Sequence, residues 1–192
     1  MGRLIYSLNV SVDGYVEAPD HGLEWTTVDD ELHAWFNDRF REVAASIYGR
    51  GLYETMAAYW PHAADDPDAT PVELEFGRIW NATPRYVFSS SLAEVEWNSR
   101  LVRDNVVEGF ARVRAEVDGD IEIGGATIAA SFMQHDLIDV YQLIVHPVAI
   151  GAGTPYFPNG APPRALRLTD SHRFGSGVVL LEYVPADANR SL

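Results

Sequence analysis

A strand-like segment that passes directly into a helix-like segment, with two glycines at the junction, most constrains how this chain can fold. Residues 121–123 alternate apolar and polar side chains, Gly124 and Gly125 follow, and residues 126–133 carry apolar side chains at helical spacing. Adjacent glycines let a ligand approach the backbone, and the first N–H groups of a helix have no intrahelical partners. The junction is either an ordinary tight turn or an anion site. Residues elsewhere in the chain are needed to distinguish the two.

Strand-like and helix-like segments alternate along most of the chain, whereas the last two strand-like segments follow each other directly. This order predicts a three-layer α/β fold with a mostly parallel central sheet, helices on both faces and an antiparallel C-terminal edge. Strands are predicted at 3–12, 46–48, 85–88, 95–97, 121–124, 138–145, 165–169 and 178–184, and helices at 28–44, 52–60, 71–80, 106–113 and 126–133.

Capping residues mark the starts of two of the helices. Thr27, with Asp30 three residues later, predicts the N-cap of the first helix. Thr70, with Pro71 and Glu73 after it, predicts a capping box at the start of the third helix.

Turn-forming residues predict the loops between these elements. Residues 15–27, the acidic segment 61–70 and the Gly- and Pro-rich segment 151–163 are expected to be loops. The final two strands are expected to pair as a hairpin around residues 175–177. Long loops in compact domains often carry function, so residues 15–27 are a candidate for the substrate side of a site.

Length and composition predict one domain over residues 1–192, with 185–192 as a polar tail. The formal charge of −14 argues against a nucleic-acid partner, and the absence of cysteine excludes disulfides and thiol chemistry. No apolar segment is long enough to cross a membrane, so we expect a cytoplasmic protein without a membrane partner. The six histidines lack metal-ligand spacing, so we expect no metal site.

Glycine and polar residues follow four of the predicted strands, where open α/β sheets bind their ligands. Gly-Gly with Thr127 suits a pyrophosphate, and Arg50 with nearby serines suits a further phosphate. The combination points to a phosphorylated dinucleotide, although GxGxxG is missing and a standard Rossmann dehydrogenase is therefore not indicated. The four strand ends are 11–14, 49–50, 89–90 and 124–127.

Several short segments together are typical of a known group of proteins. They are SVDG at 11–14, GR at 49–50 followed by YE at 53–54, VFSS at 87–90, IGG at 123–125 and HPVAIGAGTPYF at 146–157. With these segments the chain resembles the dihydrofolate reductase-like superfamily. Within it, the chain is similar to the group related to the C-terminal reductase domain of the bifunctional riboflavin-biosynthesis deaminase/reductase. The resemblance covers residues 3–184, and its most specific part is 146–157.

The resemblance implies a homodimeric, NADPH-dependent reductase with a sheet of about eight strands. Hydride would pass from NADPH to a small, ring-bearing substrate similar to a pterin or a flavin precursor. Asp13 is the implied catalytic residue, as proton relay or substrate anchor, and the implied substrate contacts are Asn9, Trp25 and Tyr53. The implied cofactor contacts are Gly49, Arg50, Ser89, Ser90, Gly124, Gly125, Ala126, Thr127 and Ile128.

Three positions depart from the pattern of the resembled group. Leu32 stands where dihydrofolate reductases carry an acid, and Ile123 stands where riboflavin-type reductases carry a glutamate before the two glycines. Leu52 replaces a hydroxyl residue that relatives often have. Glu122 is expected to point to the opposite face of its strand. A non-catalytic protein that binds a nucleotide or another small ligand on the same fold is therefore the alternative function.

Overall fold

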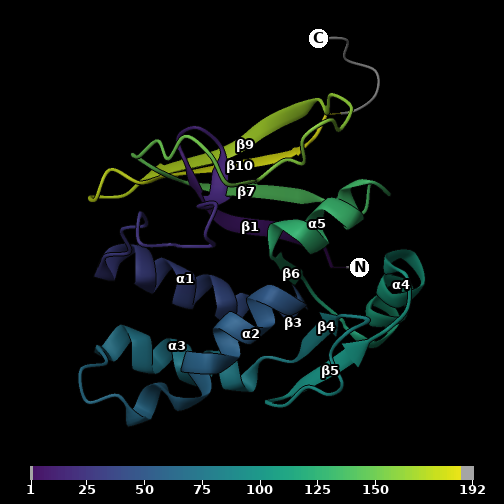
Figure 1. Ribbon diagram of the computed structural model, residues 1–192, viewed down its shortest axis with the longest axis horizontal. Coiled ribbons are helices and arrows are strands. Elements are labelled where there is room, and N and C mark those ends of the chain that lie inside the picture. The colour runs from purple at the N-terminus through teal and green to yellow at the C-terminus, as the bar shows by residue number, and fades with distance from the viewer. Residues whose placement is uncertain (1, 187–192) are drawn as a thin grey trace.

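The computed structural model describes residues 2–186 and has a central sheet with helices on both faces (Figure 1). The strands are β1 (Leu4–Ser11), β2 (Tyr15–Glu17), β3 (Ala45–Gly49), β4 (Arg85–Phe88), β5 (Ser99–Val102), β6 (Ile121–Gly124), β7 (Val140–His146), β8 (Thr154–Pro155), β9 (Leu166–Arg173) and β10 (Val179–Pro185). The helices are α1 (Asp30–Glu42), α2 (Arg50–Tyr59), the 3-10 helix η1 (Trp60–Asp65), α3 (Pro71–Ala82), α4 (Val106–Glu116) and α5 (Ala126–Met133).

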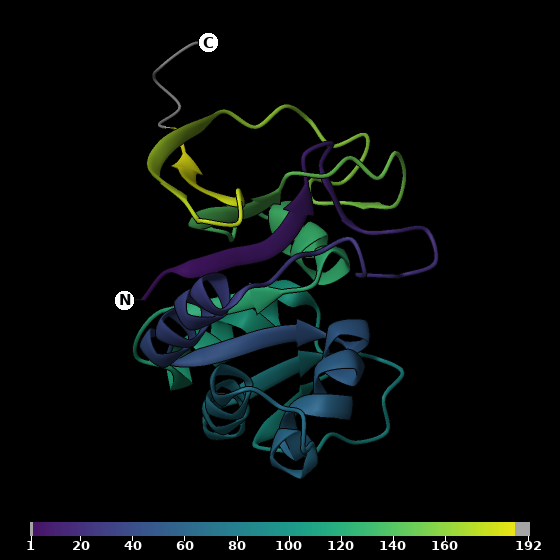
Figure 2. The same ribbon diagram turned by 90° about the vertical axis from the view of Figure 1, so that its left-hand side faces the viewer.

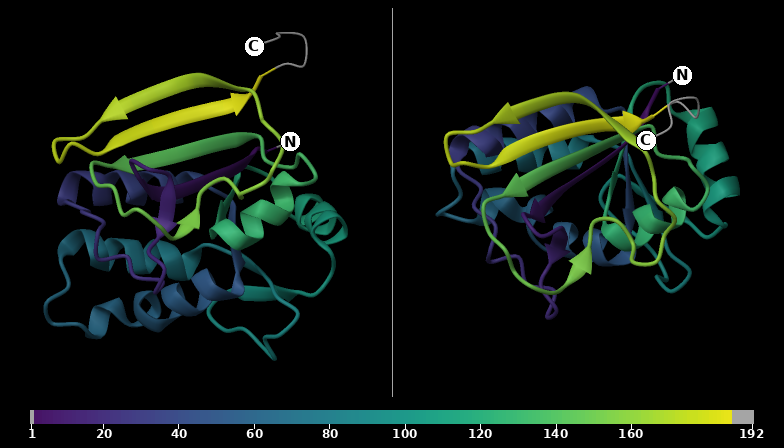
Figure 3. Two further views of the ribbon diagram at one scale, coloured as in Figure 1. Left: turned by 45° about the horizontal axis from the view of Figure 1, so that its top comes forward. Right: turned by 90° about the horizontal axis from the view of Figure 1, so that it is seen from above.

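The main sheet has eight strands in the order β5-β4-β3-β6-β1-β7-β10-β9. The strands from β5 to β7 pair in parallel, whereas β10 runs antiparallel to both β7 and β9 (Figure 3). The short strands β2 and β8 pair separately. The predicted fold, a mostly parallel sheet of about eight strands with an antiparallel C-terminal edge, is confirmed.

Alternation along the strands divides the core between the two faces of the sheet. On one face, Ile47 and Ile123 pack in a cluster with Phe110 of α4 and Phe132 of α5. On the other face, Tyr48 packs in a second cluster with apolar residues of α1, α2 and α3. Further along that second face, α1 covers β7 and β10. Each helix buries an apolar stripe against the sheet, which is the main source of stability for such amphipathic helices.

The direction of the chain reverses between the neighbouring strands β3 and β6. From β3 the chain passes through α2 and α3 to β4, on one side of β3. From β6 it passes through α5, on the opposite face, to β7 on the other side. Such a switch point opens a crevice outside the carboxyl ends of the strands, where doubly wound α/β proteins bind ligands. The carboxyl ends of β3 and β6 are therefore the expected position of a ligand site.

Several predicted elements differ in position or type, and the predicted loops 15–27 and 151–163 contain the short strands β2 and β8. The strand predicted at 95–97 does not form, because Trp97 and Asn98 have positive φ angles of 57° and 50°, and β5 begins after them. The segment 61–70 is not all loop, since η1 continues α2 as far as Asp65.

The first helix begins with a different cap from the predicted one. Asp29, not Thr27, is the N-cap of α1, and its Oδ1 accepts a hydrogen bond of 2.9 Å from the N–H of Leu32. Either residue type can cap a helix, so the sequence pattern alone did not separate them. The capping box of Thr70 and Glu73 is confirmed at the start of α3.

The C-terminal hairpin is confirmed, with the turn at Phe174–Val178 between β9 and β10. Pro185 still pairs with Leu166, so β10 extends into the predicted tail, while residues 187–192 lie outside the described residues. Within residues 2–186, no helix is both long enough and apolar enough to cross a membrane.

Candidate functional site

Most of the candidate residues lie along one edge of the sheet. The strands β4, β3, β6, β1 and β7 are consecutive and parallel, so their carboxyl ends point to the same side of the molecule (Figure 2). These ends are followed by Ser89, Arg50, Gly125 and Asp13, and β7 ends at His146. The structure thus brings together side chains that are up to 133 positions apart, Asp13 to His146.

Two helices begin side by side at this edge. Gly49 is the N-cap of α2 and Gly125 is the N-cap of α5, and neither helix has a side-chain cap. A Cβ atom on Gly49 would lie 3.2 Å from Cβ of Ile128, and one on Gly124 would lie 2.5 Å from Cδ2 of Leu52. Each helix start therefore packs against the other through a glycine. The N–H groups of both first turns give this edge a positive field.

The predicted pyrophosphate site, residues 124–128 after β6 (the cradle), has an unusual backbone conformation at its second glycine. Gly125 has φ +97°, a region that other residues rarely adopt. A Cβ atom there would be 3.6 Å or more from its neighbours, so packing alone leaves room beside the backbone. Thr127 is exposed on the first turn of α5, and Ala126 and Ile128 are half-buried beside it. Residues 125–128 of the predicted cradle are thus partly or fully exposed at this edge, whereas Gly124 is buried.

Arg50 and the serines after β4 converge beside this cradle. The Nη1 of Arg50 donates to Oγ of Ser91 over 3.4 Å, and its Nε donates to Glu54 over 3.0 Å. The Oγ atoms of Ser89 and Ser91 lie 3.4 Å apart. Ser89 Oγ also accepts from the N–H of Leu92, as serine in a turn commonly does.

The predicted cofactor contacts include neither Ser91 nor Arg103, which also lie in this region. Arg103, just beyond β5, donates to the carbonyl oxygens of Ser90, Leu92 and Ala93 over 3.4, 2.7 and 3.0 Å. Arg103 was not recognised as a strand-end residue, because the strand before it was predicted at 95–97 and forms at Ser99–Val102. Arg50 and Arg103 thus contact the same serine loop.

A second group of candidate residues lies at the carboxyl ends of β1 and β7. His146 is buried, and its Nε2 lies 2.9 Å from Oδ1 of Asn9. Its Nδ1 accepts a hydrogen bond of 3.2 Å from the backbone N–H of Thr27. The ring of Trp25 lies edge-on to the imidazole, with centroids 5.5 Å apart and an interplanar angle of 88°. Burial lowers the pKa of His146, so the imidazole is neutral at pH 7.

Asp13 ties two loops together at this edge. Its carboxylate accepts from Ser11 Oγ over 2.6 Å and from the N–H groups of Ile150 and Gly151 over 3.2 and 2.7 Å. The hydrogen bond from Ser11, helped by those from the backbone, lowers the pKa of Asp13. Asp13 is therefore an anion at neutral pH. Its oxygens already accept hydrogen bonds from the loop that follows β7.

Tyr53, a predicted substrate contact, is not brought together with Asn9 and Trp25. It is buried among apolar residues of α1, α2 and α3, and its hydroxyl oxygen accepts a 2.8 Å hydrogen bond from the N–H of Glu96. This contact holds the loop between β4 and β5 against α2, so the role that the structure gives Tyr53 is in packing.

The position of Leu32 carries no substitute acid. Leu32 is fully buried against Ile144, and the neighbouring Asp29 is occupied as the N-cap of α1. Glu31 accepts a 2.8 Å hydrogen bond from the N–H of Gly175 in the hairpin turn. Asp29 and Glu31 thus both accept hydrogen bonds from backbone N–H groups.

Glu122 faces away from the cradle, as expected. It is buried on the sheet face that α1 covers, beside Ser46 of β3, and Arg39 of α1 is the opposing positive charge. Burial raises the pKa of Glu122 to about 8. This carboxyl therefore belongs to the core and not to the crevice.

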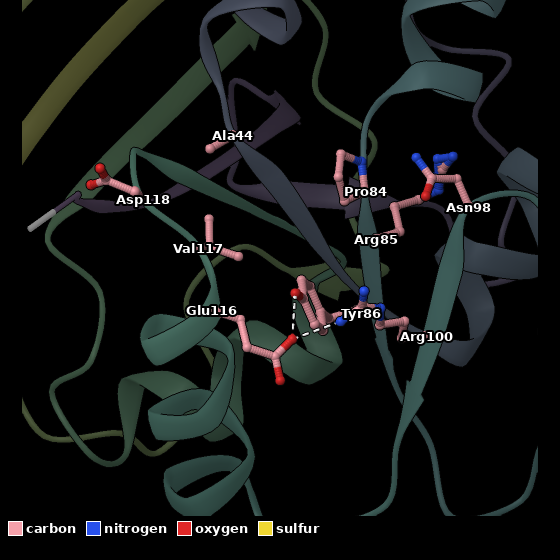
Figure 4. A pocket seen from close by; sticks show the side chains of 9 residues that line it. All are labelled: Ala44, Pro84, Arg85, Tyr86, Asn98, Arg100, Glu116, Val117 and Asp118. Atoms are coloured by element: carbon pink, nitrogen blue, oxygen red, sulfur yellow. Dashed lines mark hydrogen bonds and ion pairs between the residues drawn. The ribbon is translucent and has the colours of Figure 1, made fainter.

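A cavity of about 550 Å³ lies at the opposite edge of the sheet. It is lined at the amino-terminal ends of β3 and β4 and by the end of α4 (Figure 4). There Glu116 accepts hydrogen bonds from the Tyr86 hydroxyl over 3.1 Å and from Arg100 over 2.7 Å. Arg100 and Glu116 pair with each other there, and α4 presents its C-terminal end, so we do not assign the site to this cavity. Within residues 2–186 no group of three or more potential metal ligands comes together.

The family model for the RibD C-terminal domain matches residues 3–180 of the chain. The chain belongs to the RibD C-terminal domain family. This membership confirms the resemblance and supports a reductase-type function on this fold.

Two relatives of this RibD-family chain come from Bacillus subtilis strain 168. The protein YyaP is 29% identical over 182 residues, which cover 94% of this chain and 94% of YyaP. The protein YwjB is 26% identical over 186 residues, which cover 96% of this chain and 98% of YwjB.

Solved structures share the fold of this RibD-family chain. A putative riboflavin biosynthesis protein from Shewanella sp. PV-4 has a TM-score of 0.72 at 21% identity, with 97% of this chain and 100% of that chain covered. The diaminohydroxyphosphoribosylaminopyrimidine deaminase/5-amino-6-(5-phosphoribosylamino)uracil reductase of Thermotoga maritima has a TM-score of 0.65 at 17% identity. The alignment covers 96% of this chain but 57% of the Thermotoga chain.

Proposed function

We propose that this protein is an NADPH-dependent reductase that transfers a hydride to a small, ring-bearing substrate resembling a pterin or a flavin precursor. The observation that carries the proposal is the pair of uncapped helix starts, α2 and α5, that meet through glycines at the switch point of the sheet. Membership of the RibD C-terminal domain family supports the reductase part of the proposal.

In this proposal the cradle binds the pyrophosphate and the serine loop binds the additional phosphate of NADPH. Residues 124–128 supply backbone N–H groups and the Thr127 hydroxyl, and Gly49 lets α2 approach the same place. Arg50, Ser89, Ser90 and the newly found Ser91 supply charge and hydroxyl groups. These local donors would offset the net charge of −14, which disfavours an anionic ligand at long range.

The bound cofactor would supply the hydride, and the protein would orient the substrate and exclude water. We propose that Asn9 and Trp25 contact the substrate, and that Asp13 shapes this end of the site by fixing the loop after β7. Because Asp13 is ionised, we favour its role as an anchor over that of a proton donor. Tyr53 is left out of the proposed site.

Replacing Arg50 tests the phosphate part of the proposal. Arg50→Ala is expected to weaken NADPH binding by about 10- to 100-fold and NADH binding by less than about threefold, since a charge-assisted hydrogen bond to phosphate contributes about 1.5–3 kcal/mol. Isothermal titration calorimetry measures both affinities. Arg100→Ala is the matched control, because Arg100 is also exposed and ion-paired but lies at the opposite edge. Equal losses for NADPH and NADH would contradict the assignment of Arg50.

Asp13→Asn tests the anchor role. The variant places an NH₂ group against a backbone donor, so the amides of Ile150 and Gly151 are expected to exchange hydrogen at least about tenfold faster. NADPH affinity should change by less than about twofold, because the cradle is separate. Exchange followed by NMR measures the effect, with Asp20→Asn as control because Asp20 also accepts from a loop N–H. Unchanged exchange at both amides would remove the anchor role.

The alternative function is a binding protein without turnover, and the buried Leu32 favours it because that position offers no acid. NADPH binding without NADPH oxidation in the presence of pterins, flavin precursors and quinones would support this alternative.

We also propose a homodimer formed through the C-terminal strands. Leu143, Val145, Val179 and Leu181 are apolar and only half-buried, and Val145 pairs with Val179 while Leu143 pairs with Leu181. On the edge strand β9, Leu168 pairs with Tyr183 and is 49% exposed. Contiguous apolar surface of this kind is typical of interfaces. Light scattering is expected to give twice the mass of one chain, and the mass of a single chain would contradict the dimer.

A further inference from the structure

The hydrogen bonds of His146 determine which of its nitrogens carries the proton. The backbone N–H of Thr27 can only donate, and it points at Nδ1, so Nδ1 must be an unprotonated acceptor. The buried imidazole is neutral, and its single proton is therefore on Nε2. The edge-on contact with Trp25 holds the ring in this position.

This tautomer determines the orientation of the Asn9 amide. The Nε2–H of His146 is a donor, so the Asn9 atom 2.9 Å away must be the carbonyl oxygen Oδ1. The Asn9 NH₂ group must then point away from His146. Among the described residues, Nδ2 of Asn9 makes no hydrogen bond, and the half-buried side chain leaves it open. His146 thus acts as a positioning residue for a fixed, free donor.

In the proposed site, the carboxyl end of β1, which carries Asn9, forms the wall next to the cradle. The register pairs Tyr6 with Ile123, so β6 ends opposite Ser7 while β1 continues to Ser11. Asn9 is therefore on the part of β1 that extends beyond the end of β6. A ring held next to the cradle would meet this wall.

Three carboxylates near this wall already have partners. Asp13 binds the loop after β7, Glu17 accepts from Thr154 over 2.6 Å, and Asp29 caps α1. The position that is acidic in dihydrofolate reductases is Leu32, which is fully buried. The wall thus offers the Asn9 NH₂ group as a hydrogen-bond donor, whereas an acid at the position of Leu32 would have offered an acceptor.

We propose that the substrate is recognised through a hydrogen-bond acceptor on its ring, such as a carbonyl oxygen, by the Asn9 NH₂ group that His146 orients. The inference rests on the proposed function and assigns the residues that determine ring specificity in the same site. It selects oxo-substituted rings over rings that carry amino groups at the same positions, because a donor facing a donor leaves two polar groups unpaired.

A pair of ligands with the same ring and opposite hydrogen-bonding groups tests this selection. Pteridine-2,4-dione and 2,4-diaminopteridine are titrated into the protein with saturating NADP⁺ and without it. Wild-type protein is expected to bind the dione at least about tenfold more tightly. Asn9→Asp keeps the acceptor for His146 and replaces the NH₂ group with an acceptor, so the preference should reverse. Asn105→Asp, the same change at the distant N-cap of α4, should leave the preference unchanged.

The outcomes separate this inference from the proposed function. Failure of NADP⁺ to bind would contradict the proposed function, whereas the dione-to-diamine ratio decides the inference whether or not NADP⁺ binds. Equal binding, a preference for the diamine, no dione binding at millimolar concentration, or an unchanged ratio in Asn9→Asp would overturn it.

A second measurement applies to the wild-type protein alone and does not depend on how the variant folds. Two-dimensional ¹H–¹⁵N NMR of the histidine side chains at pH 7 should show an unprotonated Nδ1 and a protonated Nε2 for His146. A cationic ring, or the proton on Nδ1, would remove the basis for the Asn9 orientation and overturn the inference.

Discussion

Gly125→Ala is expected to lower NADPH affinity at least about 50-fold, because the added methyl group occupies the space beside the backbone where the pyrophosphate would lie. The cost to the fold should be only about 1–2 kcal/mol, the usual penalty for a non-glycine residue at positive φ. Packing adds little, since the new Cβ atom would be 3.6 Å from Leu52 and 3.7 Å from Ile128. Calorimetric titration with NADPH and urea unfolding measure the two effects.

Gly177→Ala is the matched control for this variant. Gly177 has φ +87°, close to the +97° of Gly125, but it lies in the C-terminal hairpin turn and its nearest new contact would be Pro147 at 3.9 Å. It should lose similar stability and keep its NADPH affinity. If the two variants bound NADPH equally well, the cradle after β6 would not be the pyrophosphate site.

Glu122→Gln is expected to stabilise the protein by about 4 kcal/mol at pH 8 and by less than about 1 kcal/mol at pH 5. The pKa of Glu122 is raised from 4.5 to about 8 in the folded protein, so the unfolded chain loses this proton first as pH rises. Folding stability should therefore fall between pH 4.5 and pH 8 in the wild-type protein and be restored by glutamine, which does not titrate. Urea unfolding at several pH values measures the difference.

Glu94→Gln is the control for Glu122, because Glu94 is exposed in the loop between β4 and β5. It should change stability by less than about 0.5 kcal/mol at either pH, as is usual for surface positions. A Glu122→Gln variant less stable than wild type at pH 8 would mean that Glu122 is ionised and held by Arg39, which would contradict our account of this core.

The layers of the fold could be predicted because they follow from the hydrophobic period of each segment and from the order of the segments along the chain. The alternation in 121–124 and the helical spacing in 126–133 specify a strand and a helix, and right-handed crossovers then specify the faces. The segment 95–98 could not be predicted from its apolar alternation. Trp97 and Asn98 have positive φ angles in a loop that distant side chains hold. Arg85 donates to the carbonyl oxygen of Trp97, and the Tyr53 hydroxyl donates to that of Glu96.

Only part of the candidate site could be predicted from the sequence. Glycines and serines after strands were visible in the sequence, because residue type and strand end are both local properties. The roles of Tyr53 and His146 were not, since they depend on Glu96, Thr27 and Asn9, which only the tertiary structure brings near. The sequence pattern placed Tyr53 beside Arg50 and could not indicate that its ring faces the core.

The central claim is that a phosphorylated dinucleotide binds at the carboxyl edge of the sheet, and mapping NADP⁺ onto the backbone by NMR tests it most directly. In ¹⁵N-labelled protein titrated with NADP⁺, the largest amide shift changes are expected at residues 50–52, 89–91 and 124–128. Changes confined to the cavity at the opposite edge, around Ala44, Tyr86 and Val117, or no changes at millimolar NADP⁺, would contradict the claim.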